Sequence, residues 1–121
     1  MSKKILIIED EHYLLELTEH VLKKRGYEIT TLDKGEEVVQ YAVDYQPNLI
    51  ILDNLLPDKN GVELCNEIKS TSTTQNIPII LTTGHVMEDS KQMRRYAQPD
   101  FILWKPFDIE QLCDKIEELI K

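Results

Sequence analysis

The sequence predicts a doubly wound α/β fold, in which a parallel β-sheet of five strands is covered by helices on both faces. Short apolar runs typical of buried strands alternate along the chain with segments of helical periodicity. The connections between them are short, which favours strands joined by helical crossovers. The runs at 5–8 and 49–52 contain only aliphatic residues, as expected for strands buried on both faces.

The other three strands differ in character. Residues 27–32 alternate between apolar and polar side chains, which predicts a strand exposed on one side at the edge of the sheet. A fourth strand is expected at 77–81, entered through Pro78, and a fifth at 101–104. In the order 2-1-3-4-5 the half-exposed second strand lies at an edge and the most apolar strands lie centrally. This order gives a flavodoxin-like, three-layer α/β/α sandwich.

Helical segments are expected after each strand, at about 12–25, 35–45, 62–69, 86–96 and 109–120. The first has a predicted apolar stripe and ends at Gly26, a common helix stop; the stripe consists of Leu14, Leu17, Val21 and Leu22. The last has the strongest signals, because Asp108 can cap it and Gln111 stands at the capping-box position.

Composition narrows the function classes. The chain has 121 residues, 41% of them hydrophobic, which suits one folded domain over 1–121. Its formal net charge of −8 argues against direct binding of nucleic acid or an anionic membrane. There is no apolar run long enough to span a membrane, and the first residues lack the longer apolar region and cleavage site that a signal peptide has. Cys65 and Cys113 are far apart, and we expect buried free thiols in a cytoplasmic protein.

Charged and polar residues follow the buried strands at the point where each ends. With the order 2-1-3-4-5, the carboxyl ends of adjacent strands bring together Glu9 and Asp10, Asp53, Thr83 and Lys105. Three carboxylates at one rim repel one another unless a proton or a cation neutralises them, and Mg²⁺ suits such oxygen ligands. An aspartate nucleophile beside a metal, a lysine and a hydroxyl is a site for phosphoryl transfer through an aspartyl phosphate.

Four stretches now support a resemblance over the whole chain: KILIIEDE, NLIILDNLLPDKNG, PIILTTGH and ILWKPF. In this order and spacing they resemble the response-regulator receiver domain of two-component signal transduction. The resemblance implies that Asp53 is the phosphoacceptor and that the Lys105–Pro106 peptide bond is cis. It also implies that Asp10 binds Mg²⁺ directly, Glu9 binds it through water, the Leu55 carbonyl completes the metal ligands, Thr83 is the switch hydroxyl and Lys105 binds phosphate.

Two further features of the sequence concern the switch residue and the contact surface. Thr82 and Thr83 point to opposite faces of a strand, and counting back from Gly84 favours Thr83 as the switch residue. Ile102 stands where the family usually has an aromatic residue. We interpret Ile102 and Trp104 as an apolar contact patch on the face formed by helix 4, strand 5 and helix 5, for a downstream protein or a second copy. Packing of Trp104 under a helix is the alternative.

The predicted function is a phosphorylation-dependent switch that accepts a phosphoryl group from phosphohistidine onto Asp53 with Mg²⁺. Its expected partner is a sensor histidine kinase or a histidine phosphotransfer protein, and it is not a conventional turnover enzyme. A receiver-like interaction module that works without phosphorylation is one alternative. A phosphohydrolase is another, although its usual second acid would be Leu55 here. The sequence ends after the last predicted helix, so we expect no output domain in it; it is either a stand-alone protein or part of a longer one.

Overall fold

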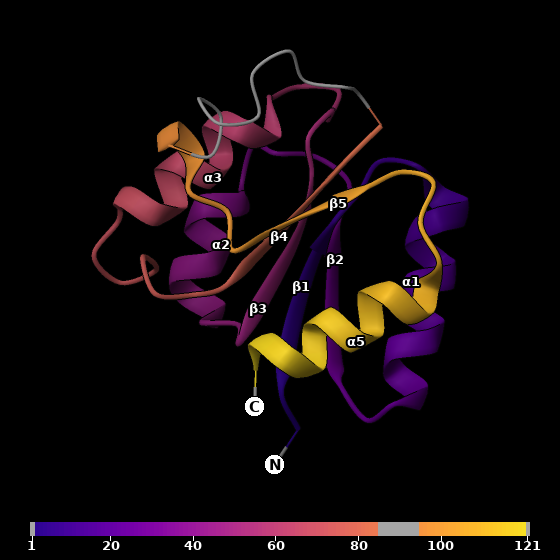
Figure 1. Cartoon of the computed structure of the whole chain (residues 1–121). Helices are drawn as coiled ribbons and strands as arrows, with labels where there is room; N and C mark the ends of the chain where they lie inside the picture. The colour runs from indigo at the N-terminus through magenta and orange to yellow at the C-terminus, as the bar shows by residue number, and fades with distance from the viewer. Residues whose placement is uncertain (1, 85–94, 121) are drawn as a thin grey trace.

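The computed structural model describes residues 2–84 and 95–120. Its five strands form one all-parallel sheet in the order β2-β1-β3-β4-β5, which confirms the predicted fold class and strand order (Figure 1). The helix expected at 86–96 falls mostly outside the described residues. The elements are β1 (Lys4–Ile8), α1 (His12–Lys24), β2 (Glu28–Leu32), α2 (Val38–Tyr45), β3 (Leu49–Asp53), α3 (Gly61–Ser70), β4 (Ile79–Thr83), β5 (Phe101–Trp104) and α5 (Ile109–Leu119).

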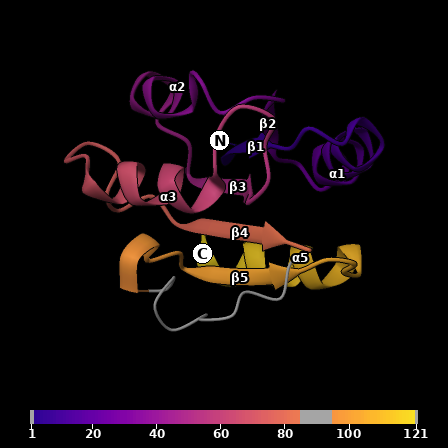
Figure 2. The same ribbon diagram turned by 90° about the horizontal axis from the view of Figure 1, so that it is seen from above.

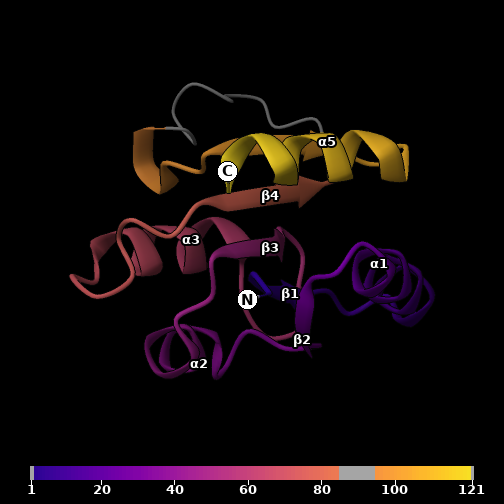
Figure 3. The same cartoon turned by 90° about the horizontal axis from the view of Figure 1, so that it is seen from below.

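Helices cover both faces of the sheet, as Figures 2 and 3 show from above and below. Helices α2 and α3 lie on one face, and α1 and α5 lie on the other. Strand alternation divides the core accordingly. In β1, Leu6 and Ile8 pack with the α2 and α3 side chains, whereas Ile5 and Ile7 pack with those of α1 and α5. Residues 5–8 of β1 and every residue of β3 are buried, as the apolar runs predict for central strands, and every residue of β4 is buried as well.

Strand β4 begins and ends two residues later than the sequence pattern predicts. Pro78 has no N–H to give to the ladder, and its carbonyl accepts a hydrogen bond from the Ile50 N–H at 3.0 Å before the strand begins. The strand then continues through Thr82 and Thr83. Both threonines are therefore paired with neighbouring strands, and the end of β4 is held firmly next to the end of β3.

Two helices also depart from expectation. In α1, Leu17 is 41% exposed, so its place in the apolar stripe is wrong; Thr18 is buried instead and its hydroxyl donates to the Leu14 carbonyl at 2.7 Å. Helix α2 begins at Val38 and not at Gly35. Gly35 lies in the loop before it, where its N–H donates at 2.8 Å to Asp58 Oδ1 of the loop after β3. Within the described part of the chain, no helix is long and apolar enough to cross a bilayer.

Helix α5 follows its sequence signals closely. The Asp108 side chain accepts a hydrogen bond from the Glu110 N–H at 3.0 Å, and the Gln111 side chain accepts one from the Asp108 N–H at 3.3 Å, which completes the capping box. Phe107 and Leu112 belong to the same apolar cluster.

The two cysteines are free and buried, as expected.

Candidate functional site

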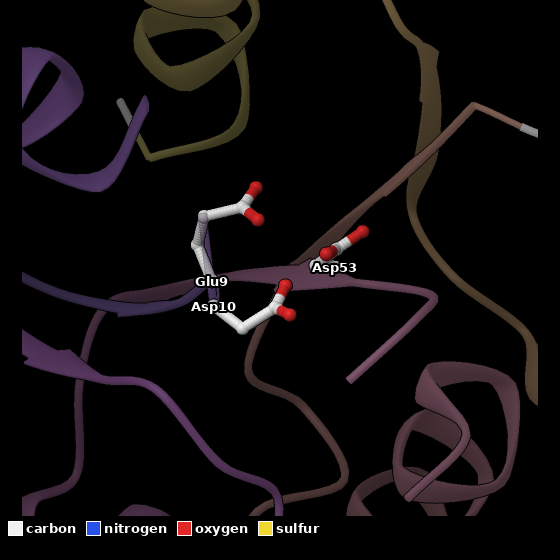
Figure 4. A group of neighbouring side chains, drawn as sticks. All are labelled: Glu9, Asp10 and Asp53. Atoms are coloured by element: carbon white, nitrogen blue, oxygen red, sulfur yellow. The ribbon is translucent and has the colours of Figure 1, made fainter. Parts of the chain in front are cut away.

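Three carboxylates converge at the carboxyl edge of the sheet. Glu9 and Asp10 directly follow β1, and Asp53 is the last residue of β3. Each offers an oxygen atom that lies within 4.8 Å of the others. Figure 4 shows the Glu9 and Asp10 carboxylates directed toward Asp53. Glu9 and Asp53 are buried, whereas Asp10 is exposed.

Strand pairing explains why these residues meet. Ile8 of β1 pairs with Leu52 of β3, so the next residue on each strand falls at the same level of the sheet. The Glu9 backbone is fixed there because its N–H donates to the Leu32 carbonyl at 3.0 Å. Acids that are more than forty positions apart in the chain therefore become neighbours by the register of two parallel strands.

Lys105 brings a positive charge to this cluster. Its backbone N–H donates to the Thr83 carbonyl at 2.8 Å, and its Nζ lies 2.9 Å from Glu9 Oε1 and 3.4 Å from Asp53 Oδ1. The Lys105–Pro106 bond is cis, as the resemblance predicts. Burial lowers the pKa of Lys105, but the hydrogen bond and charge of Glu9, with the charge of Asp53, outweigh burial and raise it. Lys105 is therefore a firmly charged ammonium.

The charge of Asp53 is costly in its buried position. Burial raises the pKa of Asp53, the nearby charge of Glu9 raises it further, and Lys105 lowers it, so that it lies at about 7. The Leu55 N–H adds a weak hydrogen bond to Asp53 Oδ1 at 3.4 Å. Near neutral pH this carboxyl group therefore exchanges easily between its protonated and ionised forms, and an added cation would favour the ionised form.

The donor set suits a small divalent cation. Three carboxylates and the Lys105 ammonium leave two negative charges in excess, which one Mg²⁺ would balance. All the side-chain ligands are hard oxygen atoms, which Mg²⁺ prefers over softer donors. The Leu55 side chain is exposed, and the role of its carbonyl as a ligand stays a prediction. Glu9, Asp10 and Asp53 are thus the residues that could hold the metal.

The two threonines lie at the end of β4 beside this cluster. Thr82 pairs with Asp53 across the β3–β4 ladder, and Thr83 pairs with Trp104 across the β4–β5 ladder. Both are buried. Because Leu81 packs on the α2 and α3 side of the sheet, alternation places the Thr83 side chain on that side as well. The role of Thr83 as the switch hydroxyl stays a prediction.

One residue of the site was missed by the sequence reasoning. Asn54 directly follows Asp53, is buried, and its Nδ2 donates to Thr83 Oγ1 over 3.5 Å. The Gly61 N–H donates to its carbonyl at 2.7 Å, which brings the start of α3 against the end of β3. The available signal was alternation, because a polar side chain one position after Asp53 has to point to the other face of the sheet.

The apolar patch predicted on β5 is only partly present. Ile102 is 7% exposed and packs in the core on the α2 and α3 side, so it is wrong as a surface residue. Trp104 is 40% exposed. Strand alternation gives both residues the same face, but burial falls off toward the end of the strand and leaves only Trp104 at the surface.

The fold and the site together define a class of protein. It is a doubly wound α/β domain that has, at the carboxyl edge of its sheet, a lysine and a cluster of acidic residues able to hold a metal ion. The family model described as "Response regulator receiver domain" matches residues 5–117, and the chain belongs to this family. The predicted family membership is therefore confirmed.

Relatives and solved structures agree with this assignment. The chain is 29% identical over 121 residues to the alkaline phosphatase synthesis transcriptional regulatory protein PhoP of Bacillus subtilis. It is 32% identical over 123 residues to the phosphate regulon transcriptional regulatory protein PhoB of Rhizobium meliloti. The alignments cover 100% of this chain but 50% and 53% of the two relatives, so the chain spans about half their length.

Among solved structures, a CheY-like response regulator receiver domain protein from Methanospirillum hungatei has a TM-score of 0.89 at 27% identity, with 98% of this chain and 93% of that one covered. The receiver domain of the sensor histidine kinase PA1611 from Pseudomonas aeruginosa has a TM-score of 0.88 at 25% identity, with 99% and 98% covered. That structure has a magnesium ion coordinated in its active site cleft.

Proposed function

We propose that this receiver domain is a phosphorylation-dependent switch in which Asp53 accepts a phosphoryl group from phosphohistidine in the presence of Mg²⁺. The observation that carries the proposal is the cluster of three carboxylates with oxygens within 4.8 Å, next to a lysine whose Nζ is 3.4 Å from Asp53. The magnesium ion in the cleft of the PA1611 receiver domain supports the choice of metal.

The reaction moves one phosphoryl group between two side chains. A carboxylate oxygen of Asp53 attacks the phosphorus of the phosphohistidine, a P–O bond forms, the P–N bond breaks, and the imidazole leaves with the electron pair and takes up a proton. When bound, Mg²⁺ would neutralise the charge of the acids and of the transferring phosphoryl oxygens. Reset occurs when water attacks the same phosphorus, which releases inorganic phosphate and restores the Asp53 carboxylate.

The Lys105 ammonium lies near two carboxylates, those of Glu9 and Asp53, and it can move from one toward the other. It lies closer to Glu9 than to Asp53, at 2.9 Å against 3.4 Å. A phosphoryl group on Asp53 adds negative charge next to Nζ, and it would draw the ammonium from Glu9 toward the phosphate oxygens. Glu9 is then released to help hold the metal. In this proposal, the pairing of Lys105 with Glu9 belongs to the resting arrangement of the switch.

We propose that phosphorylation of Asp53 changes the conformation at the carboxyl ends of β4 and β5. In this proposal Thr83 turns toward the phosphoryl group, and Trp104, its partner across the ladder, belongs to the surface that a downstream protein or a second copy reads. Ile102 contributes to that response from inside the core. Because Thr83 and Trp104 are paired on adjacent strands, a small movement of Thr83 is enough to affect Trp104.

The phosphodonor has to reach Asp53 from the open edge of the sheet. A hollow of about 370 Å³ lies beside this edge; it is lined by Glu11, Tyr13, Leu14, Lys105, Pro106 and Phe107. We propose that a sensor histidine kinase or a histidine phosphotransfer protein docks there in the cytoplasm. The exposed ring of Tyr13 offers apolar contact area for such a partner.

One experiment distinguishes this proposal from its two rivals. The protein is incubated with Mg²⁺ and acetyl phosphate as a small phosphodonor, and the intact mass is measured for the wild type and for Asp53→Asn. Asp44→Asn is the matched control, because Asp44 is an exposed aspartate on α2, away from the acidic cluster. We expect one added phosphoryl group in the wild type and in Asp44→Asn, and none in Asp53→Asn.

The other outcomes have definite meanings. If the wild type takes up no phosphoryl group, the domain is an interaction module that works without phosphorylation. If it releases many equivalents of phosphate from the donor, it is a phosphohydrolase, and the proposal that it is not a turnover enzyme fails. If Asp53→Asn is still modified, the assignment of the phosphoacceptor is wrong.

A further inference from the structure

Asn54 is a buried carboxamide whose hydrogen-bonding capacity is only partly used. It is 5% exposed, and its Nδ2 donates to Thr83 Oγ1 over 3.5 Å. Its Oδ1 accepts no hydrogen bond from any residue that the structure describes. Burying an unpaired amide oxygen costs free energy, and an apolar side chain of the same shape would avoid that cost. A contribution to the stability of the domain therefore does not explain why an asparagine stands at this position.

The backbone of Asn54 is held from both sides. Its N–H donates to the Thr82 carbonyl at 2.8 Å, and its carbonyl accepts from the Gly61 N–H at 2.7 Å. A Cβ atom at Gly61 would come within 2.6 Å of the Asn54 Cα, so the two chain segments touch. The Asn54 backbone is therefore fixed and cannot shift with Thr83 if that side chain moves.

Strand alternation places the two partners on the face of the sheet away from the Asp53 side chain. Leu52 and Leu81 pack on the α2 and α3 side, and Asn54 and Thr83 come two residues later on the same strands. Asp53, one position earlier than Asn54, points to the other side. The contact with Asn54 therefore directs the Thr83 hydroxyl away from the carboxyl group that is to be phosphorylated.

We propose that Asn54 is a positioning residue that holds the Thr83 hydroxyl in the resting state and thereby sets how easily the switch turns on. The inference rests on the proposed function, because a phosphoryl group on Asp53 is what competes for the hydroxyl. When Thr83 turns, the Asn54 amide loses a partner in a buried place, and this loss opposes the active state.

The test measures the affinity for beryllofluoride, a phosphoryl analogue, in the presence of Mg²⁺. Asn54→Leu keeps the approximate size and removes the amide, so we expect binding about 3- to 10-fold tighter than in the wild type. In a Thr83→Ala background the same substitution should change the affinity by less than about twofold, because the partner is gone. Asn66→Leu, at a half-buried position on α3, is the control and should leave the affinity unchanged.

A second measurement does not depend on phosphoryl chemistry. Three-bond couplings to the Thr83 γ-methyl report its χ1 rotamer in the free domain. We expect one dominant rotamer in the wild type and averaged couplings in Asn54→Leu. If leucine prevents folding, Asn54→Ala removes the amide without adding bulk and replaces it in both measurements.

The outcomes separate the two proposals. Unchanged Thr83 couplings in the Asn54 variant overturn this inference, whatever the domain binds. An equal gain in affinity with and without Thr83 also overturns it, because Asn54 would then act by another route. Failure of the wild type to bind beryllofluoride with Mg²⁺, with changed Thr83 couplings in the variant, contradicts the proposed function and leaves the role of Asn54 supported.

Discussion

Replacing Asp53 by asparagine should stabilise the metal-free domain at high pH, by an amount that the structure allows us to work out. The pKa of Asp53 lies at about 7, against an ordinary value of 3.8. The difference of about 3 units corresponds to about 4 kcal/mol, at 1.36 kcal/mol for each unit. Relaxation around a buried charge recovers part of this cost, so we expect a gain of about 2 to 4 kcal/mol in the free energy of unfolding.

The sign follows from which state binds more protons. Below the unfolded pKa of 3.8, Asp53 is protonated in both states and makes no difference. As the pH rises toward about 7, the unfolded chain loses this proton first, and the folded state loses up to about 1.4 kcal/mol of stability for each pH unit. Above about 7 both states are ionised and the loss is constant.

The assay is urea unfolding followed by circular dichroism, with a chelator present, at about pH 5 and about pH 8. The stability difference between Asp53→Asn and the wild type should grow by about 2 kcal/mol between the two conditions. Saturating Mg²⁺ should narrow the gap at about pH 8, because the cation stabilises the ionised wild-type site and has one carboxylate fewer to bind in the variant.

Asp44→Asn is the control, since this exposed residue should change the free energy of unfolding by less than about 0.5 kcal/mol at either pH. A stability difference for Asp53→Asn that stays the same from about pH 5 to about pH 8 would refute the reasoning. It would mean that Lys105 already compensates the buried charge of Asp53.

Two further substitutions test local packing. Gly61→Ala should destabilise the domain by about 2 kcal/mol or more, because the new Cβ would lie 2.6 Å from the Asn54 Cα and closer still to the Asp53 carbonyl; urea unfolding unchanged within about 0.5 kcal/mol would contradict this. Asp108→Ala should cost about 1 kcal/mol by removing the α5 cap, whereas Asp108→Asn should retain most of it. Equal thermal stabilities of these two variants would rule out the cap as the cause.

Much of the fold was predictable because its determinants are local. The aliphatic runs of β1 and β3, the alternation of β2 and the capping box at Asp108 and Gln111 depend on side chains close in sequence. The acids follow the strands directly, so parallel pairing was enough to bring them together. The resemblance to a known family then assigned roles to them.

Boundaries and burial were less predictable, because they depend on contacts between distant segments. Leu17 fits the helical period of α1, yet its side chain is exposed. Ile102 and Trp104 share one face of β5, but only the first is reached by the core. The start of β4 was displaced by pairing partners on β3 that no short stretch of sequence reveals.

The order of charged and apolar residues along the chain was sufficient to determine the sheet, its polar edge and the identity of the acids. The tertiary structure alone decided that Lys105 lies nearer to Glu9 than to Asp53, that the Asp53 carboxyl holds its proton up to about neutral pH, and that Asn54 reaches Thr83. The physical reason is that the two kinds of feature differ in their sensitivity to small displacements. Strand formation depends on the summed preferences of many residues, whereas the strength of an ion pair or a hydrogen bond, and the pKa of a buried group, change with displacements of about one ångström.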